Sequence, residues 1–150
     1  MTRHVLFLCT GNYYRSRFAE FVFNAICRER GLDWRAESRG LALEKAAGLP
    51  GPMSPLTFSA LEERGLTPRP PVRYPQQCCD EDLAGADLVI ALKEAEHRPY
   101  LQSRFPDWPD RVRYWHVHDL DGAEPQEAMD QIDRLVRELV DGLLSGEGRE

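Results

Sequence analysis

The sequence predicts an α/β fold in which helices cover both faces of an open, four-stranded parallel sheet. Apolar runs of strand length alternate along the chain with segments whose apolar residues recur at helical spacing. The run over residues 87–92, Asp-Leu-Val-Ile-Ala-Leu, is apolar after its first residue, which is typical of a strand covered on both faces. This alternation favours parallel strands joined by helical crossovers.

The first half of the chain contains two predicted strands and two predicted helices. Residues 5–8 form an apolar run of strand length, and residues 34–38 are the second candidate strand. A second helix is expected over residues 56–64, with Gly65 as its stop signal. The first helix lies between the two strands and ends at Gly31. Its apolar residues at helical spacing are Phe18, Phe21, Val22, Ala25 and Ile26.

The second half contains two further strands and two further helices, after a stretch without regular structure. Glycines and prolines over residues 48–55 indicate a loop, and Pro68, Pro70, Pro71 and Pro75 exclude regular structure in their segment. The strand at 87–92 is followed by a short helix from Glu94 and by a strand over 112–117. A long C-terminal helix is marked by Met129, Ile132, Leu135, Val136, Leu139, Val140, Leu143 and Leu144, and residues 145–150 are expected to fray.

Composition predicts one domain over residues 1–150, located in the cytoplasm. The chain is 42% apolar and 29% charged, as in ordinary globular proteins, and its net charge of −6 argues against a general nucleic-acid or anionic-membrane surface. Neither a secretion signal nor an apolar run long enough to span a membrane is seen. Four cysteines without a framework-like spacing suit a reducing compartment.

The segment Cys9-Thr10-Gly11-Asn12-Tyr13-Tyr14-Arg15-Ser16 carries the chemistry. It joins the first strand to the first helix, so its N–H groups can converge near the Cys9 sulfur at the positive end of that helix. This field favours a thiolate, and Arg15 offers a planar fork to two phosphate oxygens. We therefore predict Cys9 as nucleophile, Arg15 as phosphate ligand and Ser16 as a hydrogen-bond partner of the sulfur. The remaining predicted substrate-binding residues are Thr10, Gly11, Asn12, Tyr13 and Tyr14, with both tyrosine rings at the mouth.

This segment resembles the low-molecular-weight protein tyrosine phosphatases, whose signature reads Val-Cys-x-Gly-Asn-x-Cys-Arg-Ser-Pro followed by Ala-Glu. Here Ala19-Glu20 follow, while Tyr14 replaces the second cysteine and Arg17 replaces the proline. Weaker similarity covers residues 36–40 and 86–92. The resemblance implies phosphotyrosine hydrolysis through a cysteinyl-phosphate, without cofactor or metal. In arginine-phosphatase relatives a small Thr stands at the place of Tyr13, so the ring here favours phosphotyrosine in a protein or a small aryl phosphate.

The resemblance also implies a general acid shortly before the last helix. The family uses the Asp of an Asp-Pro pair, and Asp119 aligns with it, although Leu120 stands where proline is usual. A carboxylic acid there can protonate the leaving oxygen. Asp121 is two residues away and remains the alternative.

Three other interpretations compete with this one. His116, His118 and Asp119 can be read as metal ligands, but two histidines without a third close ligand are more often a polar strand end. A thioredoxin-coupled arsenate reductase shares this fold and loop, but its resolving cysteines follow the third strand, whereas Cys78 and Cys79 precede it. The departures at Tyr14, Arg17 and Leu120 leave a non-catalytic phosphate or phosphotyrosine binder as the third alternative. Cys27 is expected to pack as a small hydrophobe.

Overall fold

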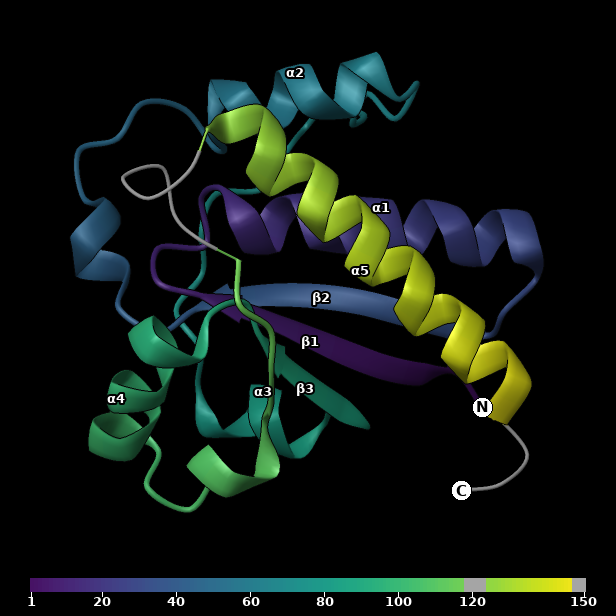
Figure 1. The fold of residues 1–150 in the computed structure, drawn as a ribbon. Coiled ribbons are helices and arrows are strands. Elements are labelled where there is room, and N and C mark those ends of the chain that lie inside the picture. The colour runs from purple at the N-terminus through teal and green to yellow at the C-terminus, as the bar shows by residue number, and fades with distance from the viewer. Residues whose placement is uncertain (118–123, 147–150) are drawn as a thin grey trace.

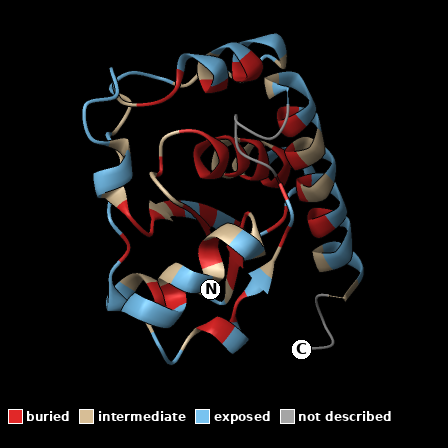
Figure 2. Ribbon diagram, turned by 60° about the vertical axis from the view of Figure 1, so that its left-hand side comes forward, coloured by how far each residue is buried: buried red, intermediate tan, exposed pale blue. Residues whose placement is uncertain are grey.

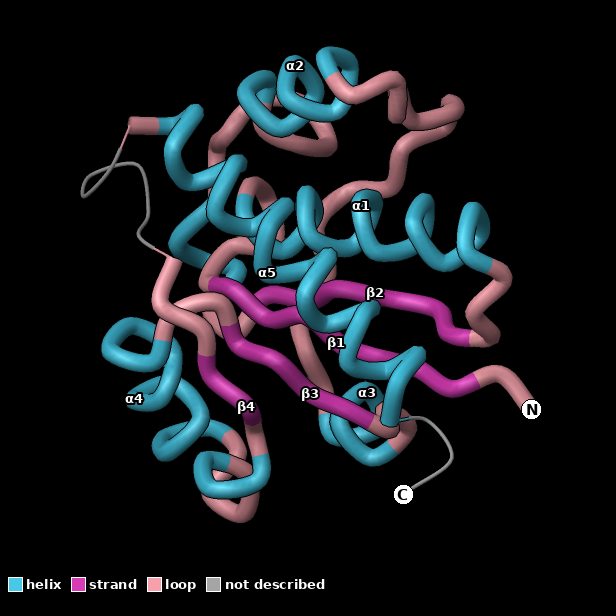
Figure 3. The backbone as a smooth tube through the Cα atoms, turned by 45° about the vertical axis from the view of Figure 1, so that its right-hand side comes forward, coloured by secondary structure: helices cyan, strands magenta, loops and turns pink. Residues whose placement is uncertain are grey.

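A four-stranded parallel sheet forms the centre of the computed structural model, which describes residues 1–117 and 124–146. The strands run in the order β2-β1-β3-β4, and every pairing between them is parallel, which confirms the predicted sheet (Figure 3). Their bounds are β1 (Arg3–Cys9), β2 (Trp34–Gly40), β3 (Leu88–Ala91) and β4 (Arg113–Tyr114).

Helices cover both faces of this sheet (Figure 1). One face carries α1 (Arg15–Arg30), α2 (Pro55–Glu63) and α5 (Pro125–Gly146), and the other carries α3 (Asp80–Ala84) and α4 (Glu94–Arg104). Two short 3-10 turns, η1 (Leu43–Ala46) and η2 (Pro109–Arg111), complete the described elements. None of the helices within the described ranges is both long enough and apolar enough to cross a membrane.

Two hydrophobic cores lie against the two faces, because successive side chains of β1 point to opposite sides. Phe7 is fully buried and packs against Phe23 of α1 and against Trp115, with ring centroids 5.9 and 5.6 Å apart. Leu6 and Leu8 pack on the other face with residues from α3 and α4. The buried residues accordingly gather on the strands and on the inward sides of the helices (Figure 2).

The ends of the helices follow the expected signals. Gly31 adopts a left-handed conformation, with φ of 68°, at the end of α1, and its N–H donates to the carbonyl of Cys27. Ser54 caps α2 by accepting from the N–H of Leu56, and Pro55 occupies the first turn. The predicted loop and helix boundaries around α2 are therefore correct to within one residue.

Four elements differ from the prediction: the fourth strand, α3 and the two 3-10 turns. The strand expected over residues 112–117 pairs with β3 only at Arg113–Tyr114, and the chain then continues beside Lys93 through a single antiparallel bridge at His116. The sequence pattern did not predict α3, because the first turn of this helix is entirely acidic and lacks apolar periodicity. The turns η1 and η2 are too short to show a helical period.

Candidate active site

The loop over residues 10–14 joins the last residue of β1, Cys9, to the first residue of α1, Arg15. It lies at the carboxyl end of the sheet, where open α/β folds bind ligands. Two glycines make its path possible. A Cβ on Gly11 would lie 2.7 Å from the Cβ of Ala46, and one on Gly40 would lie 2.8 Å from the Thr10 carbonyl oxygen. Both distances are shorter than side chains allow, so a larger residue would displace the loop.

The backbone of this loop carries hydrogen-bond donors that other described residues do not use. Within the described part of the chain, the N–H groups of Thr10, Gly11, Asn12 and Tyr13 donate to no protein acceptor. Buried N–H groups are otherwise nearly always paired. The loop therefore offers a set of donors that suits an oxyanion at the N-terminus of α1.

The hydroxyl of Ser16 is within hydrogen-bonding distance of the Cys9 sulfur. The Cys9 Sγ and Ser16 Oγ atoms are 2.9 Å apart, so the contact expected from the sequence is present. Ser16 Oγ accepts a hydrogen bond from Asn12 Nδ2, also at 2.9 Å, which leaves the hydroxyl proton available for the sulfur. When the sulfur is a thiolate, Ser16 is thus the donor in this pair.

Asn12 ties the loop to two other segments of the chain. Its φ of 52° is left-handed, which asparagine tolerates better than most residues. Its Nδ2 donates to Ser16 and Ser38, while its Oδ1 accepts from Arg73 Nη1 at 2.9 Å and from the N–H of Gln76 at 3.1 Å. All four hydrogen-bonding positions of this fully buried amide are used, so its orientation is fixed.

Arg73 is itself held by a network around Ser38. The Arg73 Nη2 atom donates to the carbonyl and the hydroxyl of Ser38 at 2.9 and 3.0 Å, and it lies 3.3 Å from Glu20 Oε1. Ser38 in turn donates to Glu20 at 2.5 Å. The burial of Arg73 lowers its pKa, while the charge of Glu20 opposes this shift.

Arg17, the residue at the family's proline position, is buried beneath the loop with 1% of its surface exposed. Its guanidinium donates to three backbone carbonyls, those of Asn12 at 3.4 Å, Pro52 at 2.9 Å and Arg73 at 2.9 Å. Burial, together with the charge of Arg73, lowers the pKa of Arg17 to about 10. The Arg17 side chain therefore connects the backbone of the loop to that of Pro52 and Arg73 through hydrogen bonds.

Arg15 is fixed by a carboxylate that sequence reasoning missed. Its Nη2 donates to Glu96 Oε2 at 2.7 Å and its Nη1 to the carbonyl of Val117 at 3.1 Å. Glu96 also accepts from the hydroxyl of Thr10. Burial raises the pKa of Glu96, but hydrogen bonds from His97, Arg15 and Thr10 and the charge of Arg15 outweigh it and hold the pKa well below its usual range.

His97 supports this carboxylate from a fully buried position. Its Nδ1 accepts from the N–H of Lys93 at 3.0 Å, so in the neutral ring the proton is on Nε2. That nitrogen lies 3.2 Å from the hydroxyl oxygen of Thr10 and 3.3 Å from Glu96 Oε2. The start of α4 thus orients Arg15 through Glu96.

A cavity of about 240 Å³ opens above Cys9. Its rim combines the half-buried ring of Tyr13 with the exposed side chains of Lys45 and Leu49. The hydroxyl of Tyr13 donates to the carbonyl of Pro50 at 2.6 Å, which fixes the ring as a wall. Tyr14 also borders the cavity, but its side chain is 6% exposed and packs in the larger core, so Tyr13 provides most of the aromatic surface.

The two candidate acids, Asp119 and Asp121, lie outside the described residues, as do His118 and Leu120. The chain leading to them is nevertheless placed beside the site, because the carbonyl of Val117 accepts from Arg15. Among residues 1–117 and 124–146, no three His, Cys, Asp or Glu side chains are grouped to hold a metal ion.

The other cysteines lie away from the loop. Cys27 is 2% exposed in the larger core, as expected of a small hydrophobe, and burial raises its pKa to about 11. Cys78 is buried in the other core, and burial raises its pKa to about 12. The backbone of Cys78 bonds to Gly40 of β2, which pairs with Cys9. Cys9 and Cys78 are thus about two strand spacings, ~10 Å, apart, beyond the reach of a disulfide.

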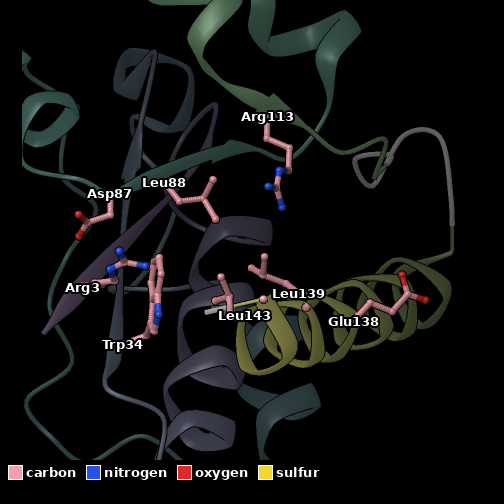
Figure 4. Close-up of a pocket in the computed structure, with 10 residues that line it drawn as sticks. Arg3, Trp34, Asp87, Leu88, Arg113, Glu138, Leu139 and Leu143 are labelled. Atoms are coloured by element: carbon pink, nitrogen blue, oxygen red, sulfur yellow. The ribbon is translucent and has the colours of Figure 1, made fainter. Parts of the chain in front are cut away.

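A larger cavity of about 420 Å³ lies at the opposite end of the sheet (Figure 4). It is lined by Arg3, Trp34 and Leu88, the first residues of three strands, and by Leu139 and Leu143 of α5. Cys9 lies six positions after Arg3 along β1, so this cavity is about 20 Å from the phosphate loop. The loop residues do not line it, and it takes no part in the site described above.

Glu96, Ser38 and Arg73 are the residues that sequence reasoning did not find. Each comes from a segment outside the signature, and each carries a polar side chain near the end of a strand or in a proline-rich loop. For Glu96, the available signal was its place in the first turn after the third strand, where a carboxylate can face the loop of the first strand.

Comparison with known proteins shows that this chain is similar to phosphatases. A protein-arginine-phosphatase of Bacillus subtilis is 26% identical over 148 residues, which cover 91% of this chain and 93% of that protein. The low molecular weight protein tyrosine phosphatase from T. tengcongensis superposes with a TM-score of 0.79 at 29% identity, over 95% of this chain and 100% of the other.

A third relative is a cysteine-to-serine mutant of the YwlE arginine phosphatase with a phosphorylated active-site serine. It superposes with a TM-score of 0.76 at 25% identity, over 93% of this chain and 95% of the other. The sequence profile described as low molecular weight phosphotyrosine protein phosphatase matches residues 4–145. The chain therefore belongs to this family of phosphatases, as the resemblance of its first loop indicates.

Proposed function

We propose that this phosphatase hydrolyses phosphotyrosine, in a protein or as a small aryl phosphate, through a phosphocysteine formed on Cys9. The observation that carries the proposal is the set of four backbone N–H groups, at residues 10–13 directly after Cys9, that have no acceptor among the described residues. These donors match the equatorial oxygens of a phosphoryl group and become most effective as charge develops on them. The phosphorylated serine of the YwlE mutant supports a phosphoryl group at this position.

In the first step the Cys9 thiolate attacks phosphorus, and the bond between phosphorus and the phenolic oxygen breaks. The loop amides and Arg15 hold the phosphoryl oxygens, while Ser16 donates to the sulfur before attack. Asp119 gives its proton to the departing phenolate, so the products are the free phenol and the phosphocysteine.

In the second step water attacks the phosphocysteine. The Asp119 carboxylate takes a proton from this water, the sulfur–phosphorus bond breaks, and inorganic phosphate leaves with the Cys9 thiolate restored. Ser16 again donates to the thiolate as its charge reappears. Each atom and proton is thus accounted for without a cofactor.

The walls of the cavity support an aryl substrate over phosphoarginine. Tyr13 and Leu49 offer apolar surface to a phenyl ring, and the exposed ammonium of Lys45 would repel a cationic guanidinium. Glu96 is the carboxylate among the described lining residues, and it is already bonded to Arg15 and Thr10. The described lining of the cavity therefore offers little negative charge to pair with the guanidinium of a phosphoarginine substrate.

The position of Cys78 and the free thiols bear on the arsenate-reductase alternative and on the cellular compartment. The distance between Cys9 and Cys78 disfavours the redox relay of an arsenate reductase. All four cysteines are free, which supports a reducing compartment such as the cytoplasm.

The test compares hydrolysis of a phosphotyrosine peptide and of a phosphoarginine peptide of the same sequence. Wild-type protein should show a kcat/KM at least tenfold higher for phosphotyrosine. Tyr13→Thr should reduce this preference by removing the fixed aromatic wall. Tyr74→Thr is the matched control, because Tyr74 is 65% exposed and lies outside the cavity lining. Preference for phosphoarginine would reverse the proposed substrate, and wild-type inactivity on both peptides would favour the non-catalytic binder.

A further inference from the structure

A third cavity, of about 390 Å³, lies behind the phosphate loop and is rich in arginine. It is bounded by the exposed edge of β2, by the first turns of α1 and by the proline-rich segment at 69–76. Arg35 and Arg39 share one face of β2, because they lie four positions apart along the strand. Arg17, Arg69 and Arg73 complete the cationic part of the lining.

The charges of this lining do not balance. Five arginines face two carboxylates, Glu20 and Glu37. Glu20 pairs with Arg73 at 3.3 Å, and Glu37 pairs with Arg39 at 3.2 Å. Within the described residues, the other three arginines of the lining, Arg17, Arg35 and Arg69, form no ion pair with a carboxylate. Asp82, which lies outside the lining, also pairs with Arg39 at 3.3 Å. An excess of two positive charges therefore remains in a chain whose net charge is −6.

The excess positive charge is energetically unfavourable because one of its arginines, Arg17, is only 1% exposed. Its Nη atoms donate only to carbonyls, and its Nε donor has no partner among the described residues. A buried charge that lacks an opposite charge is unfavourable unless a counterion compensates it. The exposed Arg35 and Arg69 stand at the open side of the same cavity, where they can contact such an ion.

We propose that this cavity binds a diphosphate group between Arg35 and Arg69, with the buried Arg17 supplying charge from the inner wall. Planar guanidinium forks match phosphate oxygens in pairs, and a diphosphate offers several such oxygens and several negative charges. The site is distinct from the active site, since neither Cys9 nor Arg15 lines it. It therefore does not rest on the proposed chemistry at Cys9.

Binding at this site is coupled to the phosphate loop. Arg17 and Arg73 line the cavity and also hold Asn12, through its carbonyl and its side-chain oxygen. A bound diphosphate would offset the repulsion between these two arginines, which contributes to the lowered pKa of Arg17. Occupancy should thus stabilise the folded protein by ligand linkage and hold the loop more firmly.

The experiment is a calorimetric titration of pyrophosphate into wild-type protein held in saturating orthovanadate, which occupies the loop above Cys9. We expect one site per chain and a rise in Tm with pyrophosphate. Arg35→Gln combined with Arg69→Gln should weaken binding at least tenfold and abolish the rise, while hydrolysis of an aryl phosphate without pyrophosphate stays unchanged. Uridine diphosphate is titrated in parallel. Tighter binding of uridine diphosphate than of pyrophosphate would identify an esterified diphosphate as the ligand, and the reverse order would identify the free anion.

The matched control is Arg113→Gln combined with Arg134→Gln. It removes the same charge from two exposed arginines outside this cavity and should leave pyrophosphate binding intact. Equal weakening in both double variants would assign binding to general surface charge and overturn the proposal. Absence of pyrophosphate binding to folded wild-type protein would overturn it as well, whatever the activity at Cys9.

Discussion

Replacing Glu96 by Gln tests whether a carboxylate outside the signature holds Arg15 for catalysis. The substitution keeps the size of the side chain and removes its charge. Glu96 accepts from Arg15 at 2.7 Å and from Thr10, and its side chain is 25% exposed against 3% for Arg15. Because the pair is shielded from water, the charge contributes more than it would at the surface.

The magnitude follows from the kind of hydrogen bond that is lost. Bonds to charged groups contribute about 1.5–3 kcal/mol and neutral ones about half of that. Of the three hydrogen bonds that Glu96 accepts, those from Arg15 and Thr10 connect it to the loop region. Their weakening in the variant removes about 1.5–3 kcal/mol of support from the loop. If this support is needed in the transition state, kcat/KM falls by about 10- to 100-fold.

The assay is kcat/KM on an activated aryl phosphate, with Glu94→Gln as control. Glu94 lies in the same first turn of α4 and pairs with Arg98 at 2.9 Å, but this pair lies at the surface. Such exposed pairs contribute little, so Glu94→Gln should change kcat/KM less than twofold. Equal activities of the two variants would refute the role of Glu96.

Stability gives a second readout with a defined sign. Because the pKa of Glu96 is lowered in the folded state, its charge stabilises the fold above the unfolded pKa of about 4.3 and loses this effect as the pH falls through the folded value. The difference in unfolding free energy between wild type and Glu96→Gln should therefore be larger at pH 7 than at pH 3. An equal difference at both pH values would contradict the shift.

The remaining predictions concern the proposed chemistry. Cys9→Ser should abolish aryl phosphate hydrolysis with the fold intact, whereas Cys27→Ser should retain it; comparable losses, read from initial rates, would remove Cys9 as the nucleophile. Arg15→Lys should lower kcat/KM and vanadate affinity together by at least tenfold, and near wild-type values in both would contradict the phosphate-loop assignment. Asp119→Asn should slow phosphotyrosine turnover much more than nitrophenyl phosphate turnover, and the same bias in Asp121→Asn alone would transfer the acid role to Asp121.

The parts of this molecule that local sequence determines were predictable. Apolar periodicity located β1, α1, β2, α2, β3 and α5, because each buries its own apolar side chains. The spacing of Cys9 and Arg15 also located the loop, since the seven consecutive residues 9–15 set its geometry. The strand β4 was predicted too long because Trp115 and Val117 are buried apolar residues that lie beyond the two residues paired with β3.

The supports of the loop depend on contacts between distant segments, which a local pattern cannot show. Glu96 is 81 residues from Arg15, and Arg73 is 61 residues from Asn12. Ser38 is 26 residues from Asn12 and reaches it only because β2 pairs with β1. Their polar side chains have no distinguishing period, so only the strand order reveals what they contact.

Arg17 shows how this chain holds its loop without the family's proline. A proline in the first helical turn restricts the backbone locally, through its fixed φ. Here the guanidinium of Arg17 instead joins the carbonyl of Asn12 to those of Pro52 and Arg73, which lie 35 and 56 residues along the chain from Arg17. Arg73 then returns to Asn12 Oδ1. The conformation of the phosphate loop thus depends on the packing of two distant segments, and a change that loosens either one acts on the geometry around Cys9.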